Sequence, residues 1–439
     1  MHGTESNFLA FGQTDKAHGV PPAGVRAPLL SVIGAAISRQ AKPASLRVEQ
    51  NSPALSFPTL AHRHIGSLDG FRGAAAMMVL FYHFGLNAKD MGIGGLLVSA
   101  AGAGWTGVDM FFALSGFLIT GILFDTKASE NYFSHFYMRR CLRIFPLYFG
   151  AIIVVEAIGL LSPAFLNWSG THPWWLPLFA TNFVYAQQGG AVTGVMTHYW
   201  TLAIEEQFYL LWPLFVWLCD RRRLMAIAAA MIGAGLALRI AMTLYQIHGE
   251  AIFSLTPTRT DSLAWGGLAA LAVRGNLGKA GNLAPIAMLL SAAGLIAVIA
   301  WRQTASPFDP LMQTAGYSLL GCLYASAIVA SLSAGILRAI FLQPWLRWLG
   351  KYSFGIYVWH PIIGSMIFYG PHPPVARGVA GALLIFAGAG LLDLLAAWLS
   401  YHYWEKPFLL LKKYFPELGS RRALSEPDIA CDQRPGEVG

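Results

Sequence analysis

Apolar runs long enough to cross a lipid bilayer recur along most of this chain, and they constrain its fold more than any other feature. A helix of about 20 predominantly apolar residues spans the roughly 30 Å of hydrocarbon in a bilayer, and such runs recur from Leu68 to near Trp404. Only 12% of the 439 residues are charged, whereas a soluble domain carries about 25%. The sequence therefore predicts an all-α fold, a polytopic membrane helix bundle without room for a separate soluble domain.

Basic residues between the apolar runs predict how the chain threads through the membrane. Loops rich in Lys and Arg stay in the cytoplasm, and alternation between them gives about ten transmembrane helices with both termini cytoplasmic. The apolar stretch 174–186 is short, and as a full span it would place Arg221, Arg222 and Arg223 outside. We interpret it as a re-entrant or interfacial segment. The run at 262–273 is short and rich in Gly, so it is a candidate for a broken helix. The expected spans cover approximately residues 68–86, 105–124, 144–161, 199–219, 224–245, 262–273, 284–301, 315–332, 354–369 and 379–404.

Composition divides the chain into three regions. Residues 1–64 are rich in Pro, Ser and Gly and predict a disordered or surface-lying cytoplasmic tail. Residues 65–410 form the integral membrane domain, and residues 411–439 a second cytoplasmic tail. The net charge of +8 resides largely in basic clusters between apolar runs, where it sets orientation, so we expect no nucleic-acid partner. The four cysteines lack metal-ligand spacing, and we expect neither a metal nor a disulfide.

Two ionisable residues in the first apolar run stand out, because a charged group at the centre of a membrane helix costs at least about 2.5 kcal/mol. Arg72 and His83 are eleven positions apart, so on a helix they share one face and lie about 16 Å apart along the axis. Neutral imidazole can accept a proton from a hydroxyl group. We therefore interpret His83 as a general base and Arg72 as its partner. The alternative is a buried, hydrogen-bonded histidine and an ordinary interfacial arginine.

Two adjacent carboxylates, Glu205 and Glu206, follow the start of the fourth expected span. Neighbouring side chains on a helix point about 100° apart, so at most one of them easily faces a common interior site. Either could orient His83 or pair with an arginine. The alternative is a wet vestibule at the outer interface, where neither carboxylate needs a partner.

A third group of polar residues lies in the basic loop before the third expected span, which holds Arg139, Arg140 and Arg143. Topogenic charge explains most such clusters, but a phosphate-rich cofactor arriving from the cytoplasm would need guanidinium groups there. Arg259 and Asp261 precede the Gly-rich run. We expect them to form an ion pair at the outer face or to contact an acceptor.

Ordered motifs along the chain resemble those of acyltransferase family 3, the integral membrane acyltransferases that include O-antigen and exopolysaccharide acetylases. The resemblance covers about residues 67–408, and each motif alone would be weak. In chain order they are LDGFRGAAAMMVLFYH, VDMFFALSGFLIT, MRRCLRIFPLY, HYWTLAIEEQFYLLWP, TRTDSLAWGG, GKYSFGIYVWHPI and YWEKPF.

The resemblance implies a multi-pass O-acyltransferase of the bacterial inner membrane, in which cytoplasmic acyl-CoA, usually acetyl-CoA, donates to a hydroxyl of a sugar or glycan. His83 matches the essential histidine of the family, Arg72 its partner, and Arg140 with Arg143 the motif that engages the phosphates of CoA. The expected catalytic group is thus His83, Arg72, Glu205 and Glu206; the donor-binding group is Arg139, Arg140, Arg143 and Tyr148; the acceptor-binding group is Trp200, Arg259, Asp261 and His360.

Two other functions fit the same polar residues. A membrane transporter of a small polar substrate also uses broken helices and charges near the midplane, and an acyltransferase could act on an acceptor other than a sugar. A covalent acyl-enzyme through Ser115 is a further route, but the sequence shows no base adjacent to it.

Overall fold

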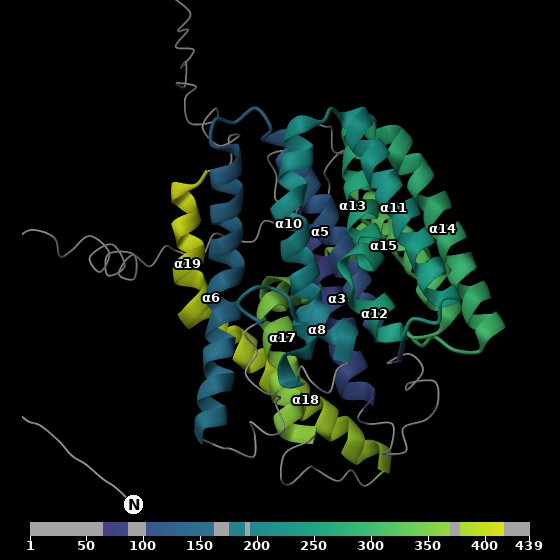
Figure 1. Cartoon of the computed structure of the whole chain (residues 1–439). Helices are drawn as coiled ribbons and strands as arrows, with labels where there is room; N and C mark the ends of the chain where they lie inside the picture. The colour runs from purple at the N-terminus through teal and green to yellow at the C-terminus, as the bar shows by residue number, and fades with distance from the viewer. Residues whose placement is uncertain (1–64, 87–101, 162–174, 189–193, 369–377, 417–439) are drawn as a thin grey trace, which may run out of the picture. The chain divides into compact units, whose positions relative to one another are not determined.

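The computed structural model describes residues 65–86, 102–161, 175–188, 194–368 and 378–416, and all regular elements in these ranges are helical. The predicted tail at 1–64 and most of the tail at 411–439 lie outside the described residues. The elements (Figure 1) are α3 Gly66–Leu86, η2 Ala103–Thr106, α5 Gly107–Asp125, α6 Tyr132–Leu161, α8 Thr181–Gln188, η3 Gly194–Tyr199, α10 Trp200–Leu218, α11 Arg221–Leu244, α12 Gly249–Ser254, α13 Thr256–Gly275, α14 Leu277–Arg302, η4 Met312–Gly316, α15 Tyr317–Leu332, α16 Ile336–Phe341, α17 Pro344–Phe368, α18 Gly378–Ser400, η5 Tyr401–Glu405, α19 Lys406–Leu410 and η6 Leu411–Tyr414.

Six stretches of helix in the described part of the chain are long and apolar enough to cross a membrane. They identify a multi-pass membrane protein. Four further helices, α3, α10, α13 and α17, have 19 to 25 residues, and these four carry most of the polar residues singled out above. The six apolar stretches are Ala103–Asp125, Tyr132–Leu161, Arg221–Leu244, Leu277–Arg302, Met312–Leu332 and Leu383–Tyr414.

Two features of the predicted threading can be compared with the helices directly. The run at 262–273 is not broken, because it lies within α13, one continuous helix of 20 residues. Its glycines pack against a neighbouring helix instead of interrupting the backbone. The end of the short apolar stretch 174–186 lies in α8, which has only 8 residues and is about 12 Å long, too short to cross a bilayer.

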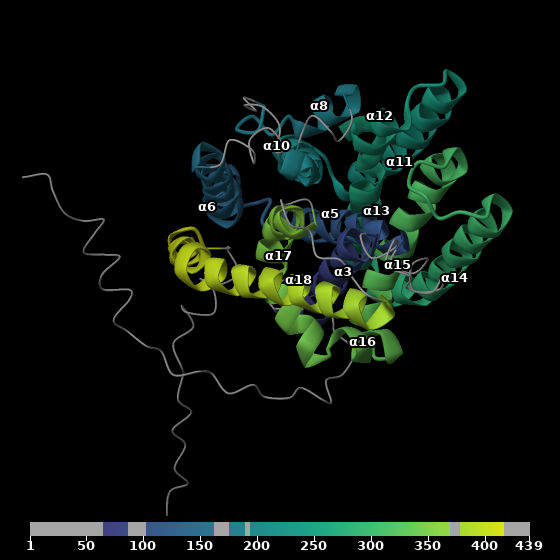
Figure 2. The same cartoon turned by 90° about the horizontal axis from the view of Figure 1, so that it is seen from below.

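The helices that carry polar residues lie inside the arrangement, and the most apolar ones lie around them. Figure 2 shows α3, α5, α13 and α17 near the centre, with α11, α14 and α15 on one side and α6 on the other. Helix α18 crosses α17 and contacts α3. Two thirds of α5 is buried, whereas about a fifth of α14 is, so α14 presents its apolar side chains outward, as a lipid-facing helix would.

Glycines allow the central helices to approach very closely. A Cβ atom at Gly116 of α5 would overlap the carbonyl oxygen of Leu263 in α13, and one at Gly266 would overlap the carbonyl oxygen of Ala113. In lipid, where helices gain little by hiding apolar surface from water, such close packing of small residues is a main source of association. A glycine also allows close contact between α3 and α17, where Gly350 packs against the backbone of Asp69.

We expect Gly116→Ala to destabilise the protein by about 1–3 kcal/mol or more, because the added methyl group forces α5 and α13 apart. The matched control is Gly233→Ala in α11, where an added Cβ meets no atom within 4 Å. That change should be neutral or slightly stabilising, since alanine favours a helix. Thermal unfolding in detergent measures both variants, and equal midpoints would contradict the close approach.

Candidate functional site

The arginines expected in a cytoplasmic loop lie instead inside α6, which begins at Tyr132. This corrects the predicted loop. The segment before Pro146 contains neither Gly nor Pro and includes good helix formers, so the helix extends inward well before the apolar run starts. Arg140 and Arg143 are three positions apart and therefore share one face of α6.

Arg72, Arg140 and Arg143, here called the arginine cluster, converge from α3 and α6. The guanidinium group of Arg72 donates to Asp69 Oδ1 at 2.9 Å, and it lies within electrostatic range of the other two arginines. Arg140 lies over the rings of Phe136 and Tyr209, 5.9 Å from each centroid. Three like charges held together at low dielectric favour an anion between them.

Carboxylates from α10 and η5 face this cluster. Glu205 and Glu206 both lie within electrostatic range of Arg140, whereas the sequence indicates that only one of them easily faces the interior. Glu405 lies within electrostatic range of Arg143. Arg140 Nε has no hydrogen-bond partner among the described residues, so this buried donor could bind an anionic oxygen.

A small pocket opens beside Arg140. Its walls include Arg139, His135, Thr126 and Ser129, at the N-terminal end of α6 and the loop before it. Arg139 donates from Nη1 to the carbonyl oxygen of Phe415 at 3.1 Å. These basic and hydroxyl side chains suit a phosphate-bearing ligand.

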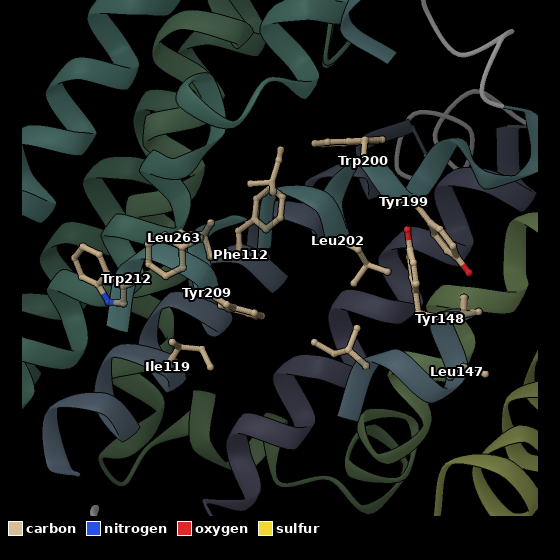
Figure 3. Packing of buried hydrophobic residues seen from close by; sticks show 14 of the residues in the cluster. Phe112, Ile119, Leu147, Tyr148, Tyr199, Trp200, Leu202, Tyr209, Trp212 and Leu263 are labelled. Carbon is tan, nitrogen blue, oxygen red and sulfur yellow. The ribbon is translucent and has the colours of Figure 1, made fainter. Parts of the chain in front are cut away.

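Tyr148, expected in the donor-binding group, is fully buried. Its hydroxyl donates to the carbonyl oxygen of Leu176 at 2.8 Å, and its ring stacks on Tyr199 with centroids 4.7 Å apart. Figure 3 shows these two rings facing each other, away from Tyr209. Tyr148 thus belongs to the buried hydrophobic core.

Three imidazole rings, those of His83, His198 and His360, meet farther along α3 and form a group here called the histidine cluster. The ring centroids of His83 and His360 are 4.8 Å apart, and those of His360 and His198 are 5.4 Å apart. They come from α3, η3 and α17. His198 was not identified from the sequence; its one signal is its position two residues before Trp200, at the start of a motif.

Backbone hydrogen bonds decide which nitrogen of two of these rings can act as an acceptor. His83 Nδ1 lies 3.0 Å from the carbonyl oxygen of Val79, and His360 Nδ1 lies 3.1 Å from that of Ile356. A carbonyl only accepts, so each Nδ1 carries the proton and each neutral ring has a lone pair on Nε2. His360 Nε2 is buried without a partner among the described residues.

The nitrogens of His198 lie near the backbone oxygens of Val195 and Val358, but neither meets hydrogen-bond geometry with any described residue. The ring is nevertheless only 7% exposed. The described part of the chain has no group of three or more His, Cys, Asp or Glu side chains arranged to hold a metal ion. The Nε2 lone pairs of His83 and His360 could each accept a proton or a hydrogen bond from a hydroxyl group.

Ser115, Tyr209 and Glu205 form a hydrogen-bonded chain beside the arginine cluster. The hydroxyl groups of Ser115 and Tyr209 are hydrogen-bonded to each other, and the Tyr209 hydroxyl is 3.1 Å from Glu205 Oε2. Ser115 lies on α5 and the other two on α10. The tertiary structure thus gives Ser115 an acid–base neighbour that the sequence does not reveal.

Arg259 and Asp261 do not pair with each other, which corrects one of the two expectations for them. Arg259 donates to both carboxylate oxygens of Asp109 at 2.9 and 3.0 Å, and Asp261 accepts from Arg239 at 2.7 Å. Side chains two positions apart on a helix point about 200° away from each other, so each finds a partner on a different neighbour. All four are essentially inaccessible. Trp200 packs beside Arg259, 5.9 Å from its guanidinium carbon.

These buried pairs predict a large effect on stability. Arg239→Met should cost about 3–5 kcal/mol, because it leaves the Asp261 carboxylate in the interior without its countercharge. Replacing both partners, by Arg239→Met with Asp261→Leu, should recover much of the loss. Arg223→Met, at a side chain 75% exposed, is the control for charge removal. Thermal unfolding measures all three, and a single variant as stable as the control would contradict the pairing.

Comparison with known proteins decides the family. Residues 65–404 match the acyltransferase domain family Acyl_transf_3. The chain belongs to acyltransferase family 3. No solved structure matches this member.

Curated relatives of this acyltransferase family 3 chain include three bacterial proteins. Peptidoglycan O-acetyltransferase OatA of Listeria monocytogenes is 31% identical over 69% of the chain and 50% of its own length. YrhL of Bacillus subtilis, provisionally named a peptidoglycan O-acetyltransferase, is 28% identical over 80% of the chain and 55% of itself. A Staphylococcus aureus protein provisionally named an O-acetyltransferase is 28% identical over 79% and 57%. The chain spans about half the length of these relatives.

Proposed function

We propose that this chain transfers an acyl group, in particular acetyl, from cytoplasmic acyl-CoA to a hydroxyl group of a carbohydrate acceptor at the membrane. The observation that carries this proposal is the arrangement of the arginine and histidine clusters, which share α3 and lie about 16 Å apart along it. Forked guanidinium groups match phosphate oxygens, and neutral imidazole matches an acceptor hydroxyl. The names of the relatives, which specify peptidoglycan and O-acetyl transfer, support a glycan acceptor.

In this proposal His83 Nε2 takes the proton of the acceptor hydroxyl as the oxygen attacks the thioester carbonyl. His360 holds the acceptor beside it, since the two rings are in contact. Arg140 and Arg143 bind the donor phosphates, and Arg139 contributes at the rim of the pocket. Arg72 adds a third guanidinium group from α3 to this donor-binding end. Glu205 and Glu206 balance the arginine charge.

Arg259, Asp261 and Trp200 belong to the acceptor side in this proposal. Their ion pairs and ring contacts fix the helices that would surround a sugar, and Arg259 Nε and Nη1 have no hydrogen-bond partner among the described residues. The corresponding topology has ten spans, with α3, α10, α13 and α17 crossing the bacterial inner membrane besides the six most apolar stretches. Both termini and the arginine cluster then face the cytoplasm.

The test uses the purified full chain in lipid nanodiscs, acetyl-CoA with an isotope-labelled acetyl group, and soluble peptidoglycan fragments or other bacterial glycans. We expect a labelled ester on the glycan, which mild alkali releases and mass spectrometry detects. If no ester forms and proteoliposomes instead accumulate a polar solute, the chain is a transporter. An ester on lipid or protein alone would identify a different acceptor class.

A further inference from the structure

The proposed reaction fixes where the acyl chain of the donor lies. The acceptor oxygen attacks the carbonyl carbon of the thioester from about 3–3.5 Å, and His83 takes the proton of that hydroxyl group. The carbonyl carbon and its sulfur therefore both lie beside His83. The CoA end of the donor extends toward the arginine cluster, and the acyl chain leaves the carbonyl carbon away from the sulfur, toward the other rings of the histidine cluster.

We propose that the ring of His198 ends the space available to this acyl chain, and that it thereby selects short acyl groups, acetyl above all. The inference rests on the proposed function and names the residue that determines which donor is used.

His198 lies on the side of the site that faces away from the donor phosphates. It belongs to η3, directly before α10, and farther along α10 the ring of Tyr209 lies under Arg140. Helix α10 thus runs from the histidine cluster toward the arginine cluster, and His198 precedes its first turn. His198 is within electrostatic range of His83, and its ring centroid is 5.4 Å from that of His360.

Contacts from two helices hold His198 in place. Its carbonyl oxygen accepts a hydrogen bond from the Tyr357 hydroxyl of α17, and that hydroxyl is 2.5 Å from Thr201 Oγ1 of α10. Its ring packs against the rings of Tyr199 and Tyr357, with centroids 4.4 and 5.1 Å away. A side chain held in this way cannot move aside for a longer acyl chain without losing these contacts.

The imidazole nitrogens of His198 contribute nothing to this placement. Neither nitrogen has a hydrogen-bond partner among the described residues, although the residue is only 7% exposed. Buried polar groups without a partner are rare in proteins. In the proposed role the ring acts by its shape, because it fills the space between the reacting carbon and the core behind it.

The core behind His198 is made of aromatic and aliphatic side chains. The ring of Tyr199 stacks on that of Tyr148, and Tyr148 on Phe179, with centroids 4.7 and 4.4 Å apart (Figure 3). Val195 and Val358, whose backbone lies near the imidazole, are both buried. Removal of the ring would leave a cavity with largely apolar walls. Such cavities stay free of water and bind apolar groups of matching size, so a longer acyl chain would fill it.

Two other roles for His198 lead to different expectations. A ring that hydrogen-bonds the substrate or carries a proton needs a nitrogen, so phenylalanine could not replace it. A ring that only stabilises the fold would change transfer from all donors by the same factor. Selection by shape depends on the volume of the side chain, and it alone changes the ratio between donors.

The experiment measures kcat/KM of the full chain in nanodiscs with acetyl-, propionyl- and butyryl-CoA and one glycan acceptor. One methylene in a pocket is discriminated about 10- to 200-fold, so the wild type should prefer acetyl-CoA to propionyl-CoA by at least about 10-fold and use butyryl-CoA least.

Replacement of His198 should change this preference in proportion to the volume removed. His198→Ala should raise the ratio of butyryl to acetyl transfer about 10-fold or more, because each methylene buried in the new cavity contributes about fourfold. His198→Thr removes less of the side chain and should raise the ratio less. His198→Phe keeps a ring and should leave the ratio and the acetyl rate unchanged.

Met312→Ala is the matched control. Met312 is 2% exposed and belongs to a separate apolar cluster with Trp105 and Leu320, so the variant creates a buried cavity away from the histidine cluster and should keep the wild-type ratio. Because the ratio of two donors does not depend on how much of the protein is folded, it can be read from unstable variants as well.

An unchanged ratio in both His198→Ala and His198→Thr would overturn the proposal, as would equal use of acetyl-CoA and butyryl-CoA by the wild type. Loss of transfer from every donor in His198→Phe would assign the role to a nitrogen and overturn selection by shape. Acetyl transfer by the wild type leaves the proposed function standing in all these cases. No transfer by the wild type from any donor would contradict the proposed function, and this inference with it.

Discussion

Replacement of His83 by alanine is expected to lower kcat for acyl transfer by about 10²–10⁴-fold, the range that a positioned general base contributes. The acceptor hydroxyl then has to lose its proton without a base, although the histidine ring of α17 remains beside the site. Binding of acetyl-CoA should change little, because the arginine cluster is about 16 Å away along α3. Transfer is measured with labelled acetyl-CoA and glycan, and donor binding by calorimetry on the same sample.

His248→Ala is the matched control for His83→Ala. His248 is exposed, lies outside both clusters and bears the same side chain, so its removal should leave kcat unchanged. Size-exclusion profiles and thermal midpoints of both variants must match the wild type. Turnover retained by His83→Ala would remove His83 from the base role and leave His198 or His360 to supply it.

Neutralising the two arginines of α6 is expected to produce the second large effect. Each charge-assisted hydrogen bond contributes about 1.5–3 kcal/mol, so Arg140→Gln and Arg143→Gln should each weaken acetyl-CoA binding about 10- to 100-fold. The loss should be smaller for dephospho-CoA, which lacks the 3′-phosphate, because fewer phosphate contacts remain to be lost. Glycan binding should be unaffected.

Arg222→Gln provides the control for these charges. It removes the same charge from an exposed position at the start of α11, away from the arginine cluster, and should not change the Kd of acetyl-CoA. If all three variants bind acetyl-CoA as the wild type does, Arg140 and Arg143 serve only to orient the chain in the membrane. Titrations of acetyl-CoA at two salt concentrations distinguish arginines that contact the ligand from arginines that attract it only at long range. Salt screens the long-range attraction more strongly.

Several properties of the site follow from local sequence alone. The membrane class follows from the apolar runs, and the shared direction of Arg72 and His83 follows from helical periodicity, which depends only on residues of one helix. The structure is consistent with that register: Arg72 lies among the arginines of α6, and His83 meets a ring of α17.

Other properties were decided by how helices pack. Ser115 and Tyr209 are 94 positions apart, and Arg259 and Asp109 are 150 apart. Whether such residues meet depends on the rotation and crossing angle of two helices, and close glycine contacts between backbones set both.

The sequence by itself determined a helical membrane protein, the acyltransferase motifs and the spacing of Arg72 and His83 along the first helix. Only the tertiary structure decided that Arg140 and Arg143 lie inside a helix, that Arg259 pairs with Asp109, and that His198 joins His83. The physical reason is that periodicity along one helix is encoded by neighbours in the chain, whereas a buried polar group in lipid takes whichever partner packing brings within reach.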